Sequence, residues 1–470
     1  MDALALARLQ FAVTIGFHFI FPPVSIGLAW MVVVAEYLGW RKADEEYVKV
    51  GGLLGKLLAI TFAVGVATGI VMEFQFGTNW SRYSMFVGDI FGAPLAAEGV
   101  FAFFLESTFM GLYLFGRGRL SKGMHWFSAL MVAVGSTLSA FWIIVANSWQ
   151  QTPAGFHLVD LPGGGQRAEL TSFFDAVFNP STLPRYFHVV TAALVTGAFV
   201  AAGVFAWHVR RDTGSAFARK GLKLGVAWGL VFAVLEVMPF GHLHAQQVAR
   251  TQPAKFAAIE GLYRHAPGNA PMLVFGVPFM KGPPPTPGMA APIEIPGLLS
   301  WMAFGDFNAP VKGLQDFPED ERPPLWLTFV SFHNMVILGV WFIFIMALAA
   351  WRLYAGKLYD SPGVLKALVI SIPLPVLACQ LGWVAAEVGR QPFIVYPGQQ
   401  ANGEPFAGLR TAMAHSPTVG AGEIAFSLVL FTAIYLSLFV LWLFLMIRKT
   451  RLAANDLAAT GAAGCGADAA

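Results

Sequence analysis

Nine long apolar stretches, separated by polar connections, make up most of the chain. A helix that crosses a membrane needs about 20 mostly apolar residues, because each residue rises about 1.5 Å and the hydrocarbon layer is roughly 30 Å thick. By that measure the pattern predicts nine spanning helices, over residues 10–38, 53–76, 94–115, 125–148, 185–208, 222–240, 326–350, 365–385 and 423–447. The expected fold class is therefore all-α, a polytopic helical bundle in a membrane.

Lysine and arginine are distributed unevenly between the two sets of connections. The loops after the odd-numbered spans, together with the C-terminal tail, hold seventeen of these residues. The short loops after the even-numbered spans hold only five, which are Arg82, Arg167, Arg185, Arg390 and Arg410. Because positive residues are retained preferentially in the cytoplasm, we expect the N-terminus to lie outside and the C-terminus in the cytoplasm.

Two segments differ from the alternation of spans and short loops. Residues 241–325 form a long outside segment, with nine prolines between Pro267 and Pro296. A connection of that length without secondary structure is usually functional or disordered. The chain is thus divided into spans one to six (1–240), the outside segment (241–325), spans seven to nine (326–451) and an Ala/Gly-rich tail (452–470) that we expect to be disordered.

Composition supports the membrane assignment and excludes several classes of protein. Of the 470 residues, 56% are hydrophobic and 12% are charged, whereas soluble domains average roughly 25% charged residues. Two cysteines, Cys379 and Cys465, exclude a disulfide framework, a cysteine-rich zinc module and a cysteine-ligated iron–sulfur cluster. A net charge of +3 without a basic tract gives no sign of nucleic acid binding. The first apolar run is longer than a signal-peptide core, so we expect it to be retained as a span.

Ionisable and potential metal-binding side chains interrupt the apolar runs, and at membrane depth a charge is costly and usually functional. They are His18, Glu98, Glu106, His188, His333, Met335, Glu387 and Arg390. The predicted orientation places five potential ligands or acids in the outer half of the bilayer, namely His18, Glu98, His188, Met335 and Glu387. Glu106 follows Glu98 by eight residues, which corresponds to about 12 Å further toward the cytoplasm.

Imidazole and thioether groups are axial ligands of haem iron, and a His/Met pair gives a six-coordinate haem that transfers electrons. Each residue alone has a simpler explanation. His18 could brace the kink at Pro22–Pro23, Met335 could fill the core, and the two glutamates could form interhelical hydrogen bonds instead of a proton relay. The convergence of such side chains at one depth favours a haem site.

The histidines exclude two other redox architectures. A haem–copper oxidase needs six metal-binding histidines in its spans, and a quinol–cytochrome b bundle needs paired histidines on each of two spans. This chain has ten histidines, only three of them well inside predicted spans, and no span holds such a pair.

Five sequence blocks, in order, resemble subunit I of the cytochrome bd-type quinol oxidases. They are RLQFAVTIGFHF (8–19), GVATGIVMEFQFGTNW (65–80), VGDIFGAPLAAEGVFAFFLEST (87–108), STLSAFWIIVANSW (136–149) and AEVGRQP (386–392). The resemblance extends from about residue 5 to residue 450, and the length of the outside segment matches the short-loop, cyanide-insensitive branch of the family.

The resemblance implies a terminal respiratory oxidase in the bacterial inner (cytoplasmic) membrane. Such an enzyme oxidises membrane quinol on the outer side and reduces O2 to water with cytoplasmic protons, which generates a proton motive force without pumping. The implied cofactors are a low-spin haem b558 with axial ligands His188 and Met335, a high-spin haem b595, and haem d or a second high-spin haem b. His18 and Glu387 match the ligands of the two high-spin haems, and which residue binds which haem stays open.

The resemblance also implies roles around these haems. Residues matching the haem surroundings are Arg8, Trp383 and Arg390. Glu98 matches the acid beside the di-haem site, and the residues matching a proton route to it are Glu106, Ser107 and Ser139. The stretch AKFAAIE (254–260) matches the quinol-binding stretch, with Lys255 and Glu260 as its polar contacts. The implied partners are a second large membrane subunit (subunit II), small single-span subunits, membrane quinol and O2, and no nucleic acid.

The chain departs from the family pattern at two positions. His333 stands where many relatives carry arginine, and Phe393 stands where tryptophan usually follows GRQP. Two alternatives remain open: an oxidase of the same family with haem b replacing haem d, and a haem-free proton-coupled transporter whose buried acids carry protons. No internal repeat is visible in the sequence, which argues against a transporter built from inverted repeats.

Overall fold

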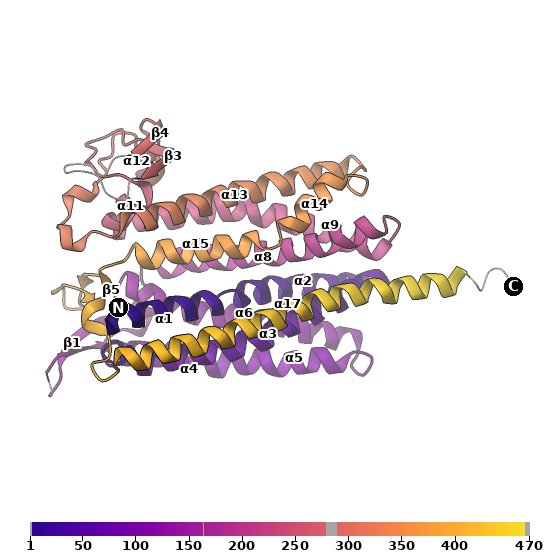
Figure 1. Cartoon of the computed structure of the whole chain (residues 1–470), viewed down its shortest axis with the longest axis horizontal. Coiled ribbons are helices and arrows are strands. Elements are labelled where there is room, and N and C mark those ends of the chain that lie inside the picture. Colours follow the sequence, from indigo (N-terminus) through magenta and orange to yellow (C-terminus); the bar gives the residue numbers. More distant parts are fainter. Residues whose placement is uncertain (1, 163, 279–288, 466–470) are drawn as a thin grey trace.

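The computed structural model describes residues 2–162, 164–278 and 289–465. Within these residues, nine helical stretches are long and apolar enough to cross a membrane. They are Ala3–Arg41, Glu45–Thr78, Ser81–Gly116, Lys122–Gln151, Thr182–Arg211, Ala216–Thr251, Leu325–Tyr354, Pro362–Val388 and Ala421–Ala453. Each predicted span lies inside one of them, so the predicted all-α membrane bundle is confirmed. Figure 1 shows the helices lying side by side along one direction.

Five of the nine stretches belong to uninterrupted helices: α3 (Glu45–Thr78), α6 (Lys122–Gln151), α8 (Thr182–Arg211), α13 (Leu325–Tyr354) and α17 (Ala421–Cys465). The other four change geometry part of the way along. They are α1 (Ala3–His18) with α2 (Phe21–Arg41), α4 (Ser81–Ala97) with η1 (Glu98–Phe103) and α5 (Phe104–Gly116), α9 (Ala216–Leu235) with η2 (Glu236–Gly241) and α10 (His242–Thr251), and α14 (Pro362–Ile370) with α15 (Leu374–Val388).

Proline lies at or near every interruption. Pro22 and Pro23 begin α2, Pro94 lies four residues before η1, Pro239 lies inside η2, and Pro373 precedes α15. Proline has no N–H and its ring clashes with the carbonyl one turn earlier, so it breaks the regular ladder of helical hydrogen bonds. η1 and η2 are π-helical turns, a geometry often found at functional sites, and each begins with a glutamate.

The core lies where α2, α3, α8 and α9 pack together. α2 crosses α8 at a pair of facing glycines: a Cβ atom on Gly197 would lie 2.2 Å from the backbone carbonyl carbon of Gly27. Small residues at such a crossing allow helix backbones to approach closely, which is the usual way that membrane helices associate. This crossing joins the helix that follows His18 to the helix that carries His188.

Short strands and helices cover one end of the bundle, the end where the N-terminus lies (Figure 1). The antiparallel pairs are β1 (Phe156–Asp160) with β2 (Gln166–Leu170), β3 (Met272–Pro278) with β4 (Met289–Ile295), β5 (Phe393–Val395) with β8 (Leu409–Arg410), and β6 (Gly398–Gln399) with β7 (Pro405–Phe406). The short helices are α7 (Phe173–Val177), α11 (Pro253–Glu260), α12 (Leu298–Phe304) and α16 (Thr411–Ala414), with 3-10 turns η3 (Leu314–Asp316) and η4 (Glu319–Glu321).

Two boundaries differ from those expected. The sixth spanning stretch continues to Thr251, so the segment that starts at residue 241 begins as helix and then forms α11, β3, β4 and α12. α17 continues to Cys465, where a disordered tail was expected from residue 452; alanine has the highest helix propensity and is frequent there. Residues 466–470 lie outside the described residues. The orientation of the termini across the membrane stays a prediction.

Candidate functional site

α15 makes contacts with several of the segments that carry predicted haem ligands. Its Gln380 donates a hydrogen bond to the carbonyl of Gly16 on α1, at 2.8 Å. Its Trp383 packs edge-on against Phe19, directly after His18, with ring centroids 5.2 Å apart. α15 also packs against α13, which carries Met335, and against α8, which carries His188. Figure 1 shows α15 lying between α13 and α1. The segments that carry the predicted ligands thus pack around one helix, which itself carries Glu387.

His18 ends α1, and its ring lies against α3. Its Nδ1 is 3.0 Å from the hydroxyl of Thr68, and a Cβ atom on the adjacent Gly69 would lie 3.1 Å from its Cε1 atom. The Thr68 hydroxyl itself donates to the Val64 carbonyl at 3.0 Å, so it acts as acceptor toward the ring. This arrangement suits the tautomer with its proton on Nδ1, in which Nε2 is the ring nitrogen that can bind a metal.

Met335 lies on α13 opposite a glycine of α15. A Cβ atom on Gly382 would lie 3.0 Å from the Met335 sulfur. A residue larger than glycine at position 382 would therefore collide with the Met335 sulfur. The neighbouring departure from the family pattern, His333, faces the loops instead: its Nε2 lies 3.1 Å from the carbonyl of Leu273 in β3, and its ring stacks on Phe329 at 3.9 Å.

His188 lies near the start of α8, beside the π-helical turn η2. Its Nδ1 is 3.0 Å from Oε1 of Glu236, the first residue of that turn. The ring of His244 on α10 is also a neighbour of His188, with centroids 5.2 Å apart. As for His18, an oxygen faces Nδ1, and this leaves Nε2 available to a metal.

Glu387 is the centre of a polar network at the covered end of the bundle. Its carboxylate accepts hydrogen bonds from Asn147 at 3.2 Å and from Gln151 at 3.3 Å, both on α6. It also pairs with Arg390, whose guanidinium donates to Gln150 at 2.6 Å. The buried Arg185 of α8 contacts Asn147. These donors surround the carboxylate on several sides, an arrangement that suits a metal ligand or an anion in a charged network.

One side chain connects Glu387 to the predicted quinol-binding stretch. Gln151 donates to Glu387 through its nitrogen, and its oxygen accepts from Lys255 at 3.0 Å and from Gln252 at 2.9 Å. Lys255 is buried, and this burial together with the positive charge of Arg185 holds the pKa of its amine well below the ordinary range. The two predicted regions are therefore joined by a single amide.

Glu260 is also buried, at the C-terminal end of α11. Burial raises the pKa of its carboxyl group to about 7. Its Oε2 has no hydrogen-bond partner among the described residues, and within that same part of the chain no ion pair joins it to Lys255. An acid with this pKa and a free oxygen can take up or release a proton near neutral pH.

Glu98 and Glu106 both face α6, but through different serines than expected. Ser139 donates to Glu98 at 2.8 Å, and Ser136 donates to Glu106 at 2.5 Å. Ser139 therefore pairs with Glu98, and Glu106 pairs with Ser136, about one turn away on α6. Ser107 bonds to the carbonyl of Phe103 in its own helix, at 2.8 Å. Adjacent helical residues do not share a face, so Ser107 does not contact Glu106.

Two further residues were singled out in the sequence, Arg8 as part of the haem surroundings and Phe393 as a departure from the family pattern. Arg8 is exposed on α1 and has no side-chain hydrogen bond in the described part of the chain. Phe393 begins β5, and the guanidinium of Arg410 lies 5.6 Å from its ring centroid.

Sequence reasoning missed three groups that complete the site, namely Glu236, Ser136 and Gln151. Glu236 could have been found by the same rule that identified Glu98, since it is a carboxylate within an apolar run. Ser136 and Gln151 carry no such signal, because serine and glutamine are common in helices and acquire meaning only from their neighbours.

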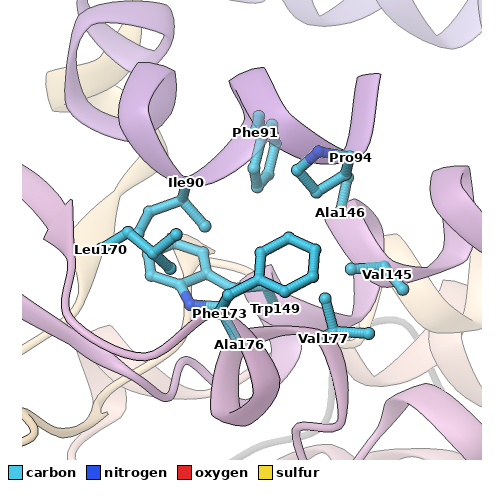
Figure 2. A pocket seen from close by; sticks show the side chains of 10 residues that line it. All are labelled: Ile90, Phe91, Pro94, Val145, Ala146, Trp149, Leu170, Phe173, Ala176 and Val177. Atoms are coloured by element: carbon cyan, nitrogen blue, oxygen red, sulfur yellow. The ribbon is translucent and has the colours of Figure 1, made fainter. Parts of the chain in front are cut away.

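Two cavities differ in what they can hold. The pocket in Figure 2 has a volume of about 10 Å³, and its walls are apolar side chains of α4, α6, β2 and α7, including Pro94 and Trp149. It has room for about one water molecule and no polar groups to hold it. A larger cavity of about 440 Å³ lies between the start of α8 and η2–α10, next to the stacked rings of Phe187 and Phe240. It has the size of a small-molecule site, and neither Lys255 nor Glu260 lines it.

The donor set fits haem. Both histidines present Nε2 with Nδ1 already facing an oxygen, as metal-bound histidines generally do. Gly69 faces the ring of His18, and Gly382 faces the sulfur of Met335. A side chain at either position would crowd the ligand. Within the residues that the structure describes, no three His, Cys, Asp or Glu side chains are grouped to hold a bare metal ion, whereas haem iron needs only one or two ligands from the protein.

Comparisons with known proteins agree on one family. The family model for cytochrome bd terminal oxidase subunit I matches residues 6–454. The chain is 39% identical to cytochrome bd ubiquinol oxidase subunit 1 of Bacillus subtilis, over 96% of this chain and 94% of the relative. It is 34% identical to cytochrome bd-II ubiquinol oxidase subunit 1 of Escherichia coli, over 96% and 97%. Among solved structures, the bd oxidase from Geobacillus thermodenitrificans matches with a TM-score of 0.85 and 31% identity, over 96% of this chain and 98% of the other.

Proposed function

The chain belongs to the family of cytochrome bd terminal oxidase subunit I, and from that premise we propose how its site works. Members of this family are subunits of quinol oxidases, and this chain is accordingly a multi-pass membrane enzyme subunit. The proposed reaction transfers four electrons from two quinols to O2, releases four protons on the outer side, and consumes four protons from the cytoplasm to form two waters.

The observation that carries this proposal is the packing of α15, which carries Glu387, against α13 with Met335 and against the residues on either side of His18. In both His18 and His188 an oxygen lies 3.0 Å from Nδ1. We assign His188 and Met335 to the low-spin haem b558, and His18 and Glu387 to the high-spin haem b595 and to haem d or a second haem b. When bound, the haems accept electrons one at a time and provide an open iron position for oxygen.

At the covered end of the bundle, α11 supplies the groups proposed to act on quinol. Glu260 accepts a quinol proton, for which its pKa of about 7 is suited. Lys255 orients the second quinol oxygen, and its bond to Gln151 connects that position to Glu387. The amide of Gln151 thereby fixes the position of the proposed quinol site relative to the proposed high-spin haem ligand Glu387.

Protons for oxygen reduction are proposed to rise along the face between α5 and α6. Glu106 with Ser136 forms the inner station and Glu98 with Ser139 the outer station. The two stations are eight residues apart on one helical stretch, and carboxylates at such depth are stable only when paired or hydrated. The route needs no pump, because protons are consumed and released on opposite sides of the membrane.

The exposed face of α17 supports the proposed surroundings of the chain. The apolar residues of α17 are mostly exposed, with Phe426, Val429 and Val440 each at least 66% accessible. A subunit of this family is expected to pair with a subunit II, and lipid or that subunit would cover such a face. We place the complex in the bacterial inner membrane.

The decisive experiment is a pyridine haemochrome analysis of the purified complex, with a quinol oxidation assay on the same sample. We expect haem b in the preparation, quinol-dependent oxygen consumption, and a long-wavelength chlorin band if haem d fills the third position. A colourless preparation that still assembles with its partners would overturn the oxidase assignment in favour of a transporter.

A further inference from the structure

Glu236 is a carboxylate in the membrane that none of the roles above requires. It begins the π-helical turn η2, and its Oε1 lies 3.0 Å from Nδ1 of His188. Its second oxygen and Nδ1 of His188 are both buried without a hydrogen-bond partner among the described residues, so the two side chains meet as a charge contact. Its side chain is 14% exposed, and that of His188 is 19% exposed. An unpaired carboxylate at this depth is costly, so the contact with His188 is its main compensation.

The helix geometry directs Glu236 toward this histidine. Pro239 interrupts the regular hydrogen bonds of the sixth span, and the chain passes through a π-helical turn from Glu236 to Gly241. The next residue, Val237, faces the other way: a Cβ atom on Gly339 of α13 would lie 3.0 Å from its side chain. η2 therefore lies between α8 and α13, the two helices that carry the proposed haem ligands, and presents its carboxylate to α8.

We propose that Glu236 is a positioning residue for the low-spin haem: it holds the proton of His188 on Nδ1, aims Nε2 at the iron, and lowers the reduction potential of that haem. This inference rests on the proposed ligand role of His188. A carboxylate behind a ligating imidazole makes the ligand more basic and fixes its orientation. Its negative charge also favours the ferric over the ferrous haem, because the ferric form carries one more positive charge.

The test compares Glu236→Gln with the unmodified complex by reduced-minus-oxidised spectroscopy and by redox titration of the low-spin haem. Glutamine keeps an oxygen that can accept from Nδ1 but removes the charge. We expect the low-spin spectrum to persist and the midpoint potential to become more positive. Glu236→Asp retains the charge at a longer distance and should give a smaller shift in the same direction. Unchanged potentials in both variants would overturn the proposal, and the Asp variant serves alone where the Gln variant does not assemble.

Glu36→Gln is the matched control. Glu36 is a buried carboxylate on α2, paired with Arg117 and Tyr113. It lies nine residues beyond Gly27 on α2, on the opposite side of the α2–α8 crossing from His188. The rise per residue places it about 20 Å from the level of His188. Its removal should leave the low-spin potential unchanged, and an equal shift there would show a nonspecific effect and overturn the proposal.

His188→Ala separates this inference from the assignment on which it rests. If the low-spin spectrum survives in His188→Ala, the ligand assignment is wrong, and the inference about Glu236 is overturned with it. If that spectrum is lost in His188→Ala but the potential is unchanged in Glu236→Gln and Glu236→Asp, the ligand assignment stands and only the role of Glu236 is overturned.

Discussion

Met335 is the single residue on which the low-spin site can be tested with least disturbance. Leucine has nearly the same volume as methionine, so Met335→Leu should change packing by less than about 1.5 kcal/mol while it removes the sulfur. We expect the low-spin spectrum to be lost, or the potential of that haem to fall strongly. Quinol-driven turnover should drop, while oxygen reduction with artificial reductants persists. An unaltered low-spin spectrum in this variant would refute the ligand assignment.

Glu106 provides a second test at this scale, with a neighbour as its control. Glu106→Gln keeps the shape of the side chain and can still bond to Ser136, but it cannot exchange a proton. Proton transfer by a positioned group contributes roughly 10²–10⁴-fold to a rate, so we expect oxygen consumption to fall by at least about tenfold in an assembled complex. Ser107→Ala should retain the normal rate, because Ser107 bonds only within its own helix. Full activity in Glu106→Gln would make Glu106 a structural residue.

Glu260 predicts a pH dependence of quinol oxidation. Its pKa of about 7 means that the carboxyl group is neutral in acid and ionised above neutrality, and only the ionised form can accept a quinol proton. Turnover measured with saturating quinol should therefore rise as the pH increases through about 7. Glu260→Gln should flatten this rise and lower the rate, with haem content intact. Normal kinetics in both Glu260→Gln and Lys255→Ala would direct the search to the 440 Å³ cavity beside Phe187.

At the scale of elements, the crossing of α2 and α8 holds the two histidine-bearing segments together. A Cβ atom on Gly197 would meet backbone atoms of Gly27 at 2.2–2.6 Å, and backbone cannot move aside as a side chain can. We expect Gly197→Ala to cost about 1–3 kcal/mol, with a lower Tm and reduced haem content. The same change at Gly111 on α5, where a Cβ atom would meet nothing within 4 Å, should leave both unchanged. Equal Tm values for the two variants would contradict the crossing as a determinant of stability.

The sequence predicted elements better than it predicted contacts between them. Each span was visible because the bilayer imposes a minimum length of apolar residues, and the helix interruptions lie close to visible prolines. The partners of Glu106 and Glu387 were not visible, because they depend on helix register. Ser139 bonds to Glu98 rather than to Glu106, whose partner is Ser136.

At the scale of the whole molecule, the orientation in the membrane is the main expectation that requires its own experiment. Asp160 is exposed at the end of β1, and Arg119 is exposed at the opposite end of the bundle. In a Cys465→Ser background, we expect a membrane-impermeant maleimide to label Asp160→Cys in spheroplasts, and to label Arg119→Cys only after lysis. The partly buried Cys379, which lies within the spanning helix α15, should remain unlabelled in both. The reverse pattern would invert the topology and place the quinol-binding stretch on the cytoplasmic side.

The vertical spacing of Glu98 and Glu106 has an electrical consequence. The serines that bond the two carboxylates, Ser139 and Ser136, are three residues apart on the regular helix α6, which is about 4.5 Å in depth and about a seventh of a hydrocarbon layer of roughly 30 Å. Moving one charge across the full layer against 100 mV costs about 2.3 kcal/mol, so this step alone costs about 0.3 kcal/mol. If the step limits the rate, a membrane charged to about 100 mV slows turnover about 1.8-fold relative to a depolarised one. The depth of two glutamates would thus make oxygen consumption respond to the voltage that it creates.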